Sequence, residues 1–217
     1  MLTSDGSSTI HLLDWNENYH SMHGAIQESK HVFISKGLDA ILLSEISILE
    51  IGFGTGLNCF ITFLETLEKE ISINYVGLEA FPVTKEEVTK LNYVSELKAV
   101  KHQSVFEHIH TSNWEEKNQI SANFWLTKRK QFFNDISDNN AFNLIYFDAF
   151  GPEHQPKLWT VDIFKKMFDA LKVNGILVTY SAKGSVRRAM QEVGFIVERL
   201  DGPPGKREML RATKHSA

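Results

Sequence analysis

The chain has 217 residues, with 23 Lys or Arg and 27 Asp or Glu, so its formal net charge is −4 when the histidines are neutral. This mildly acidic balance excludes a polybasic nucleic-acid coat, and a hydrophobic fraction of 42% with 15 Phe and 4 Trp indicates a folded core. The sequence contains one cysteine, Cys59, which excludes an internal disulfide framework and which we expect to be a small buried packing residue. No apolar stretch approaches the roughly 18 residues of a membrane span and no signal peptide is evident, so we expect a soluble, cytoplasmic protein.

The first forty residues differ in pattern from the rest of the chain. Asp5-Gly6, followed by two serines, is a turn signal that predicts a small hairpin over residues 3–10. A polar stretch rich in His and Ser then leads into an apolar run at residues 31–34. We interpret residues 1–40 as an N-terminal cap on a domain that occupies residues 41–217.

From about residue 46, short strands alternate with helices. The expected strands cover residues 47–51, 71–78, 142–147, 175–180 and 195–199. The expected helices cover residues 57–67, 159–171 and 185–193, with a further helix that begins at Thr84, where Glu87 completes a capping box. Residues 100–140 give no readable pattern. The alternation predicts an α/β fold with a Rossmann-like, doubly wound, mostly parallel sheet.

The strongest motif joins the first strand of this sheet to its first helix and reads Glu50-Ile51-Gly52-Phe53-Gly54-Thr55-Gly56-Leu57-Asn58. Its glycines allow a sharp turn and a close approach to a ligand, and a helix N-terminus offers free N–H groups. The dinucleotide spacing fails, because Leu57 or Cys59 stands where the third glycine would be needed. An acidic residue two positions before Gly-x-Gly-x-Gly instead resembles the first motif of class I S-adenosylmethionine-dependent methyltransferases. The alternative is a glycine-rich turn that binds no ligand.

Two further carboxylates follow expected strands. Glu79 ends the second strand, where a carboxylate can accept hydrogen bonds from both hydroxyls of a ribose, although it can also be a solvated strand-end charge. Asp148 ends an apolar strand and is followed by Phe150 and Pro152, which suggest a rigid apolar wall. A half-buried carboxylate needs partners, so we favour a binding or catalytic role over a loop cap.

Several segments together resemble one family, the methyltransferase domain of the tRNA-modifying enzyme MnmC and its stand-alone MnmD-type relatives. The segments that carry the resemblance run through nearly the whole chain in order, namely Glu28 to Phe33, Glu50 to Asn58, Leu78 to Pro82, Phe147 to Trp159, Thr179 to Gly194 and Gly205 to Leu210. The glycine motif is shared by a whole superfamily, whereas the D-A-F-G-P run and the G-K-R-E-M-L ending are more specific.

The resemblance implies methylation of the exocyclic amine of 5-aminomethyl-2-thiouridine at the wobble position, with S-adenosyl-L-methionine as cofactor and the tRNA anticodon stem-loop as partner. MnmC also carries an FAD-dependent domain that exposes this amine. A chain of 217 residues leaves no room for that domain. We therefore expect another enzyme to make the aminomethyl precursor, and we count it as a candidate partner.

The site residues that we expect fall into three groups. Asp148 is the candidate catalytic residue, because a carboxylate near the attacking nitrogen can hold it and receive its proton. The cofactor is expected to contact Glu50, Gly52, Phe53, Gly54, Thr55, Gly56, Asn58, Glu79, Ala80, Asp148 and Phe150. The tRNA is expected to contact Tyr19, Lys183, Arg187, Lys206 and Arg207. Tyr19 and His23 are also candidate partners of Asp148 from the cap.

The sequence departs from the family pattern near the expected adenine contact. Many members have a Gly-Asp pair after the third strand, but the corresponding stretch here is Leu126-Thr127-Lys128-Arg129-Lys130. Asp135 lies too far along the chain to replace the missing acid. The family's D-G-F-A-P also becomes D-A-F-G-P, which keeps the aspartate and the apolar wall.

Charge is distributed unevenly along the chain. From residue 183 onward there are eight basic and four acidic residues, so this tail carries +4 and residues 1–182 carry −8. We expect a basic face on an acidic body, with residues 128–130 as a second basic cluster and a solvated face as the alternative. Arg187 and Arg188 cannot both point the same way on a helix, so one of them is expected to face the nucleic acid.

His102, His108 and His110 match no common metal-ligand spacing, so we interpret them as surface residues and expect no metal site.

Two other functions are weighed against the leading one. A small-amine methyltransferase or a polyamine-synthase-like aminopropyltransferase would share the glycine loop and the aspartate but would not need the basic tail. A non-catalytic RNA-binding module could retain the fold, but Glu79 and Asp148 are both present.

Overall fold

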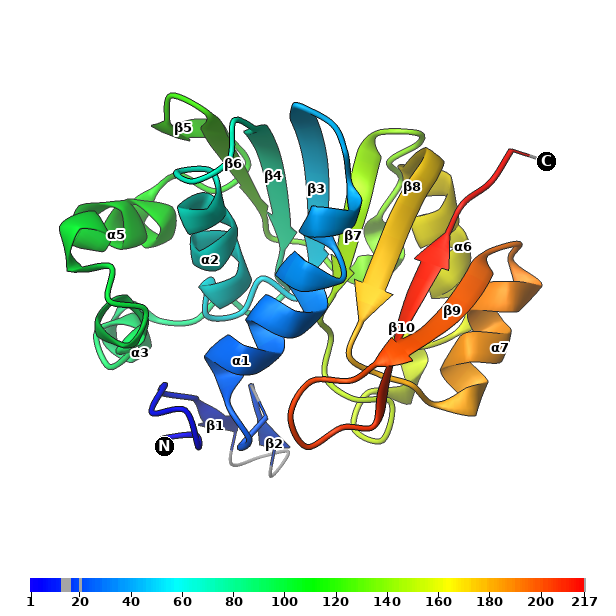
Figure 1. Cartoon of the computed structure of the whole chain (residues 1–217), viewed down its shortest axis with the longest axis horizontal. Coiled ribbons are helices and arrows are strands. Elements are labelled where there is room, and N and C mark those ends of the chain that lie inside the picture. Colours follow the sequence, from blue (N-terminus) through cyan, green and yellow to red (C-terminus); the bar gives the residue numbers. More distant parts are fainter. Residues whose placement is uncertain (13–16, 20, 217) are drawn as a thin grey trace.

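The computed structural model describes residues 1–12, 17–19 and 21–216, and a mixed sheet in the order β5-β6-β4-β3-β7-β8-β10-β9 forms its centre (Figure 1). The strands of this sheet are β3 Glu45–Ile51, β4 Ser72–Leu78, β5 Lys117–Ser121, β6 Phe124–Arg129, β7 Phe142–Phe147, β8 Leu171–Thr179, β9 Ile196–Asp201 and β10 Glu208–Thr213. The central strands from β6 to β8 pair in parallel, while β5 and β10 run antiparallel to their neighbours. The predicted α/β fold with a mostly parallel sheet is therefore confirmed.

Helices cover both faces of the sheet. In Figure 1 the face toward the viewer carries α1 Ala25–Ser29, which continues into the π-helical segment Lys30–Ser35, together with α2 Leu57–Glu65 and α5 Gln103–Thr111. The far face carries α6 Val161–Ala170 and α7 Gly184–Glu192. The shorter helices are α3 Lys85–Val88, α4 Tyr93–Glu96 and the single 3₁₀ turns Leu38–Ala40, Val100–His102, Phe133–Asp135 and Pro156–Leu158.

The core follows from the alternation of side chains along the central strands. Ile48 belongs to the apolar cluster under α1, α2 and α5, whereas its neighbour Leu49 belongs to the cluster under α6 and α7. Strands that are buried on both faces have near-continuous apolar sequences, as β7 does. Phe33 of the π-helical segment packs against Tyr146 of β7, with ring centroids 5.0 Å apart. The segment Lys30–Ser35 is thus joined to the sheet through the core.

The elements without a strong apolar pattern are the ones that the sequence did not predict. Residues 100–140 form α5, β5 and β6, and the G-K-R-E-M-L segment begins β10. β5 is an edge strand with polar residues, and it lacks the apolar signature of a buried strand. The hairpin expected over residues 3–10 is reduced to one antiparallel bridge between Leu2 and Ser8, while β1 His11–Leu12 pairs with β2 Glu17–Asn18.

Two local predictions are confirmed. Thr84 and Glu87 form the capping box of α3, since each side chain accepts from the backbone N–H of the other residue. Cys59 is fully buried in α2.

The topology places the loops that follow β3, β4 and β7 together at one edge of the sheet. From β3 the chain proceeds to β4 on one side, and β7 lies on the other side, so the strand order reverses between β3 and β7. Open α/β sheets bind ligands at the carboxyl ends of the strands at such a switch point. This edge faces the bottom of Figure 1, next to β1 and β2. Within the part of the chain that the structure describes, no helix is long and apolar enough to cross a membrane.

Candidate functional site

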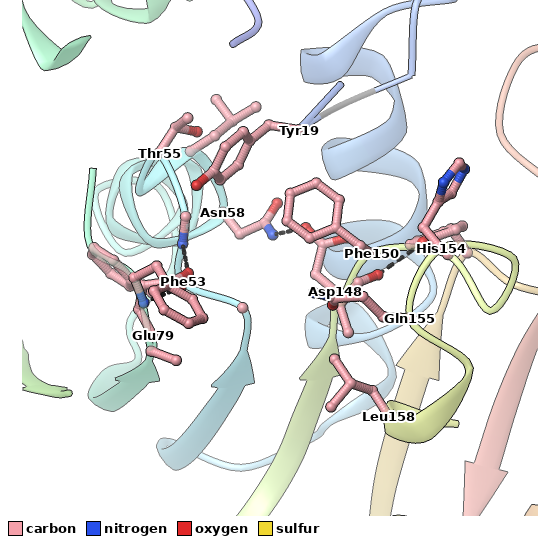
Figure 2. Close-up of a pocket in the computed structure, with 18 of the residues that line it drawn as sticks. Tyr19, Phe53, Thr55, Asn58, Glu79, Asp148, Phe150, His154, Gln155 and Leu158 are labelled. Atoms are coloured by element: carbon pink, nitrogen blue, oxygen red, sulfur yellow. Dashed lines mark hydrogen bonds between the residues drawn. The ribbon is translucent and has the colours of Figure 1, made fainter. Parts of the chain in front are cut away.

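A cavity of about 1100 Å³ opens at the carboxyl ends of β3, β4 and β7 (Figure 2). This volume is at the upper end of the usual range for small-molecule sites, so the cavity can hold a nucleotide-sized ligand together with a second reactant. The expected site residues that line it are Tyr19, His23, Gly52, Phe53, Gly54, Thr55, Asn58, Glu79, Ala80, Asp148, Phe150 and Lys206. The expected residues that are not part of its lining are Glu50, Gly56, Lys183, Arg187 and Arg207.

The glycine loop between β3 and α2 forms one wall. Gly52 and Gly54 have φ values of +89° and +48°, which side chains rarely adopt. A Cβ on Gly52 would lie 2.7 Å from the backbone oxygen of Asp148, and one on Gly54 would lie 3.0 Å from the Tyr19 ring. A residue with a side chain therefore does not fit at Gly52 or Gly54.

Glu79, at the end of β4, holds the loop in place. Its carboxylate accepts hydrogen bonds from Gly54 N at 3.0 Å and from Phe81 N at 2.9 Å. Burial raises the pKa of Glu79, against the effect of these backbone donors. A carboxylate has about four acceptor positions, so Glu79 keeps capacity to accept from a ligand hydroxyl group.

Asn58, in the first turn of α2, connects two carboxylates. Its Nδ2 donates to Glu50 Oε1 at 2.9 Å and to Asp148 Oδ2 at 2.8 Å, the latter visible in Figure 2. Its Oδ1 accepts from Ser29 Oγ at 2.5 Å. All of the polar groups of the amide are used, so the orientation of Asn58 is fixed.

Glu50 lies behind Asn58 and is 1% exposed. Its Oε2 accepts from Tyr75 OH at 2.8 Å, and burial raises the pKa of the carboxyl well above its usual value. The sequence prediction placed Glu50 in contact with the cofactor, whereas here Glu50 reaches the cavity through Asn58. Glu50 is not part of the cavity lining, and its burial could not be read from the motif.

Asp148 is the acid at the centre of the cavity wall. Burial and the nearby Glu28 carboxylate raise the pKa of Asp148 to about 7, while the hydrogen bond from Asn58 and the Lys206 ammonium act in the opposite direction. A carboxylate whose pKa is near neutrality is suited to accepting a proton at physiological pH.

Aromatic residues enclose Asp148. Tyr19 of the cap meets Phe150 edge to face with centroids 5.1 Å apart, and Figure 2 shows both rings above Asp148. Phe150 is held by Trp159, whose Nε1 donates to the Phe150 backbone oxygen at 2.8 Å. The apolar wall expected from D-A-F-G-P is thus present.

Lys206 occupies a different position from the one expected for a tRNA backbone contact. It lies inside the cavity, where its ammonium pairs with Glu28 of α1 and stands 3.9 Å from the centroid of the Tyr180 ring. Arg207 beside it is exposed. Sequence reasoning missed Glu28 and Tyr180 as site residues, although both lie in segments that carry the family resemblance.

The other basic residues near residue 183 differ in how far their side chains are exposed. Lys183 is exposed and pairs with Glu153. Arg187 is partly buried, and its Nε has no hydrogen-bond partner among the described residues, whereas Arg188 is the exposed member of the pair.

The prediction of a second exposed basic cluster over residues 128–130 is wrong for Lys128. Lys128 is 1% exposed, and its Nζ donates to the backbone oxygen of His110 at 2.9 Å. Burial lowers the pKa of Lys128 to about 8. Arg129 pairs with Asp138 at 2.8 Å, which leaves Lys130 as the exposed cation of the three.

The interpretation of the three histidines as surface residues fails for two of them. His102 has a buried Nε2, and its ring lies against Phe63 with centroids 5.5 Å apart. The second is His110. Its ring packs beneath the glycine loop, and a Cβ on Gly56 would lie 3.2 Å from His110 Cε1. Burial lowers the pKa of His110 to about 4, so the ring is neutral at physiological pH. No cluster of three or more His, Cys, Asp or Glu residues suited to a metal occurs among residues 1–12, 17–19 and 21–216.

Comparison with known proteins defines the class. Residues 91–215 match the family described as S-adenosyl-L-methionine-dependent methyltransferase. The chain therefore belongs to the S-adenosyl-L-methionine-dependent methyltransferase family.

The individual relatives share one name. The chain is 27% identical over 213 residues to the tRNA 5-methylaminomethyl-2-thiouridine biosynthesis bifunctional protein MnmC of Idiomarina loihiensis, and the match covers 90% of this chain and 35% of that protein. The MnmC of Leptospira interrogans is 29% identical over 228 residues, with 97% of this chain and 34% of that protein covered. The chain thus spans about a third of the length of the curated relatives that it matches.

Solved structures agree with this class. The crystal structure of MNMC2 from Aquifex aeolicus superposes with a TM-score of 0.78 at 25% identity and covers 100% of this chain and 70% of that one. Spermidine synthase from Thermotoga maritima shares the fold, with a TM-score of 0.54 at 14% identity over 96% of this chain and 68% of that one.

The residues of the cavity fit the cofactor of this family. Gly52 and Gly54 present bare backbone to the cavity, and Glu79 beside them can accept hydrogen bonds from a ribose. After β6, where the family's acidic adenine contact is missing, Phe132, Phe133 and Asn134 line the cavity, and Asp135 does not. When bound, S-adenosylmethionine supplies an electrophilic methyl group on a positively charged sulfur.

Proposed function

We propose that this protein methylates the exocyclic amine of 5-aminomethyl-(2-thio)uridine at the wobble position of tRNA, with S-adenosyl-L-methionine as the methyl donor. The main support is the Asp148 carboxyl, whose pKa is about 7, in a cavity with room for the donor and an extruded nucleotide. The likeness to MNMC2 and the names of the MnmC relatives add support for the substrate.

The residues of the chain would act mainly by orientation and proton transfer. An amine must lose a proton to attack carbon, and methyl transfer requires the nitrogen to be aligned with the bond that breaks. Asn58 fixes Asp148 Oδ2, so we assign Oδ1 as the atom that accepts this proton. Tyr19 and Phe150 would exclude water from the reacting atoms.

The cofactor side would be held by the glycine loop and Glu79. We propose that Gly52, Gly54 and Thr55 provide the close backbone surface, and that Phe53, Ala80 and Phe150 provide apolar contacts from the cavity wall. Glu50 and Gly56 would act indirectly, through Asn58 and through the shape of the loop.

We also propose that residues 1–40 serve as a cap and residues 41–217 as the methyltransferase domain. Tyr19 supports this division, because it reaches the cavity from the cap. The packing of Phe33 on Tyr146 indicates that the cap and the domain form one folding unit.

Methyl incorporation tests the function. The protein would be incubated with tritiated S-adenosylmethionine and tRNA that carries 5-aminomethyl-2-thiouridine, and nucleosides would be identified by mass spectrometry. We expect label in the methylaminomethyl nucleoside. Label in putrescine or another small amine but not in tRNA would contradict the proposal and favour the small-amine alternative. Calorimetry with S-adenosylmethionine separates both from a non-catalytic module, which would show no binding.

A further inference from the structure

Lys206 stands in a small cation site on the Asp148 side of the cavity. Its ammonium donates to Glu28 Oε1 and lies 3.9 Å from the centre of the Tyr180 ring. The side chains of Glu28 and Lys206 are 13% and 30% exposed. A carboxylate and an aromatic face are the two groups that bind an alkylammonium, and both gain strength when they are shielded from water.

The two walls of this site are anchored by further contacts, whereas Lys206 reaches the site from a loop. Tyr180 OH donates to the backbone oxygen of Ala149 at 2.8 Å, which joins the ring to the residue next to Asp148. Glu28 lies on α1, whose helix continues into the core. Lys206 comes from the loop between β9 and β10 on a flexible four-carbon stem, so the lysine can leave without disturbing either wall.

The site adjoins the candidate catalytic acid. Glu28 and Lys206 both influence the charge of Asp148, in opposite directions. An alkylammonium held at Glu28 would therefore lie in the electrostatic reach of the group that we assign to take its proton. Lys206 presents the same chemical group, a primary alkylammonium, as the proposed acceptor does before deprotonation.

We propose that the Glu28 carboxylate and the Tyr180 ring form the binding site for the ammonium of the acceptor, and that Lys206 occupies this site until the acceptor replaces it. The identity of the acceptor rests on the proposed function, but the cation site itself does not. Once displaced, the Lys206 ammonium lies free at the cavity mouth, where it can pair with a phosphate of the bound nucleic acid.

Binding of a small cation tests the site without any catalysis. The probe is carbon-13-labelled methylammonium, followed by NMR line broadening in the wild type, in Lys206→Ala and in the double variant Lys206→Ala/Glu28→Gln. We expect Lys206→Ala to bind methylammonium at least about tenfold more tightly than the wild type, because the tethered competitor is gone. The double variant should lose this gain. Lys69→Ala, which removes a lysine paired with Glu65 and Asp39 at another surface, should match the wild type.

Folding is checked by thermal unfolding and by calorimetry with S-adenosylhomocysteine, which reports on the cofactor half of the cavity. A folded Lys206→Ala protein that binds no more methylammonium than the wild type overturns the proposal. If that variant does not fold, Lys206→Ser replaces it under the same criterion. Gain of binding that persists in the double variant also overturns it, because Glu28 would then not be the counter-ion.

The same proteins separate this proposal from the proposed function. If the wild type does not methylate aminomethyl-bearing tRNA but Lys206→Ala binds methylammonium through Glu28, the substrate is wrong and the cation site stands. If tRNA is methylated and methylammonium does not bind, the site is wrong and the function stands. If tRNA is methylated and Lys206→Ala binds methylammonium through Glu28, then Glu28→Gln should raise KM for the tRNA more than it lowers kcat.

Discussion

Asp148 illustrates how the role that we propose for one residue can carry a cost in stability. Its carboxyl ends an apolar strand, and burial together with Glu28 raises its pKa to about 7 from an ordinary value of 3.8. The unfolded chain ionises this group freely, whereas the folded protein does so at a cost. This free-energy cost to folding is absent below pH 3.8. It grows as the pH rises from 3.8 to about 7 and reaches its full size above pH 7.

Replacement of Asp148 should therefore affect activity and stability in opposite directions. We expect Asp148→Asn to lower the rate of methyl transfer at least about 100-fold, because the proton acceptor is lost. The free energy of unfolding should rise by about 1–3 kcal/mol at pH 8 and remain unchanged at pH 3. Denaturant titrations at the two pH values check this, and a variant with near-normal transfer would remove Asp148 from the mechanism.

The pH dependence of the reaction should report on the neighbours of Asp148. Loss of a negative neighbour lowers the pKa of Asp148 and loss of a positive one raises it. We expect Glu28→Gln to move the rise in kcat/KM to lower pH by about 0.5–1 unit, and Lys206→Met to move it upward by a similar amount. Shifts in the same direction would indicate a general structural effect. The charged and hydrogen-bonding groups that act on or lie behind Asp148 are Glu28, Asn58, Lys206 and Glu50.

At the scale of elements, the glycine loop depends on its backbone conformation. Gly52→Ala would place a Cβ 2.7 Å from the Asp148 backbone oxygen at a φ of +89°. We expect the affinity for S-adenosylmethionine to fall at least about tenfold and stability to fall by about 1–2 kcal/mol. Calorimetry and thermal unfolding measure the two effects. Gly184→Ala is the matched control, because its Cβ would meet the flexible end of Arg188; an equal loss of cofactor affinity in the control would argue against a local effect.

The elements that could be predicted from the sequence are those with strong apolar or turn patterns. β3, β4 and β7 are rich in apolar and β-branched residues. The glycine loop follows β3 and Asp148 follows β7, so the site could be located before the fold was known. β5 is polar and β10 mixes charged and apolar residues, so neither gave a strand signal.

The part of the site that could not be predicted depends on distant contacts and on burial. Glu28 and Lys206 are 178 positions apart, and nothing local to either residue indicates that they meet. Lys128 and His110 are ordinary surface types by composition, yet Lys128 is fully buried and the His110 ring packs beneath the glycine loop. A charge count along the chain cannot separate such residues from exposed ones.

At the scale of the whole molecule, the basic tail divides between the cavity and the surface. Arg188 and Arg207 are exposed, whereas Lys206 is held by Glu28 inside the cavity. Binding of tRNA through phosphate contacts weakens with salt in proportion to the number of contacts. Only the exposed residues are therefore expected to contribute to the salt dependence of the first encounter.

We expect Arg207→Ala to weaken tRNA binding at low salt. The plot of log K for tRNA binding against log salt should become less steep, with the magnitude of its negative slope smaller by about 0.7–1. Filter binding over a range of salt concentrations measures this slope. Lys69→Ala, at another surface, removes the same charge and should leave the slope as it is. An unchanged slope in Arg207→Ala would exclude that contact.

The contact between Glu28 and Lys206 also bears on how the protein is made. During synthesis from the N-terminus, β3, β4 and β7 emerge from the ribosome well before residue 206 does. A nascent chain can then contain the glycine loop, Asp148 and the neighbouring Glu28 carboxylate before Lys206, the cation that pairs with Glu28, has been synthesised. Arrested chains that end before residue 206 should thus expose a negatively charged, open cavity, and the last hairpin should act as the step that completes the enzyme.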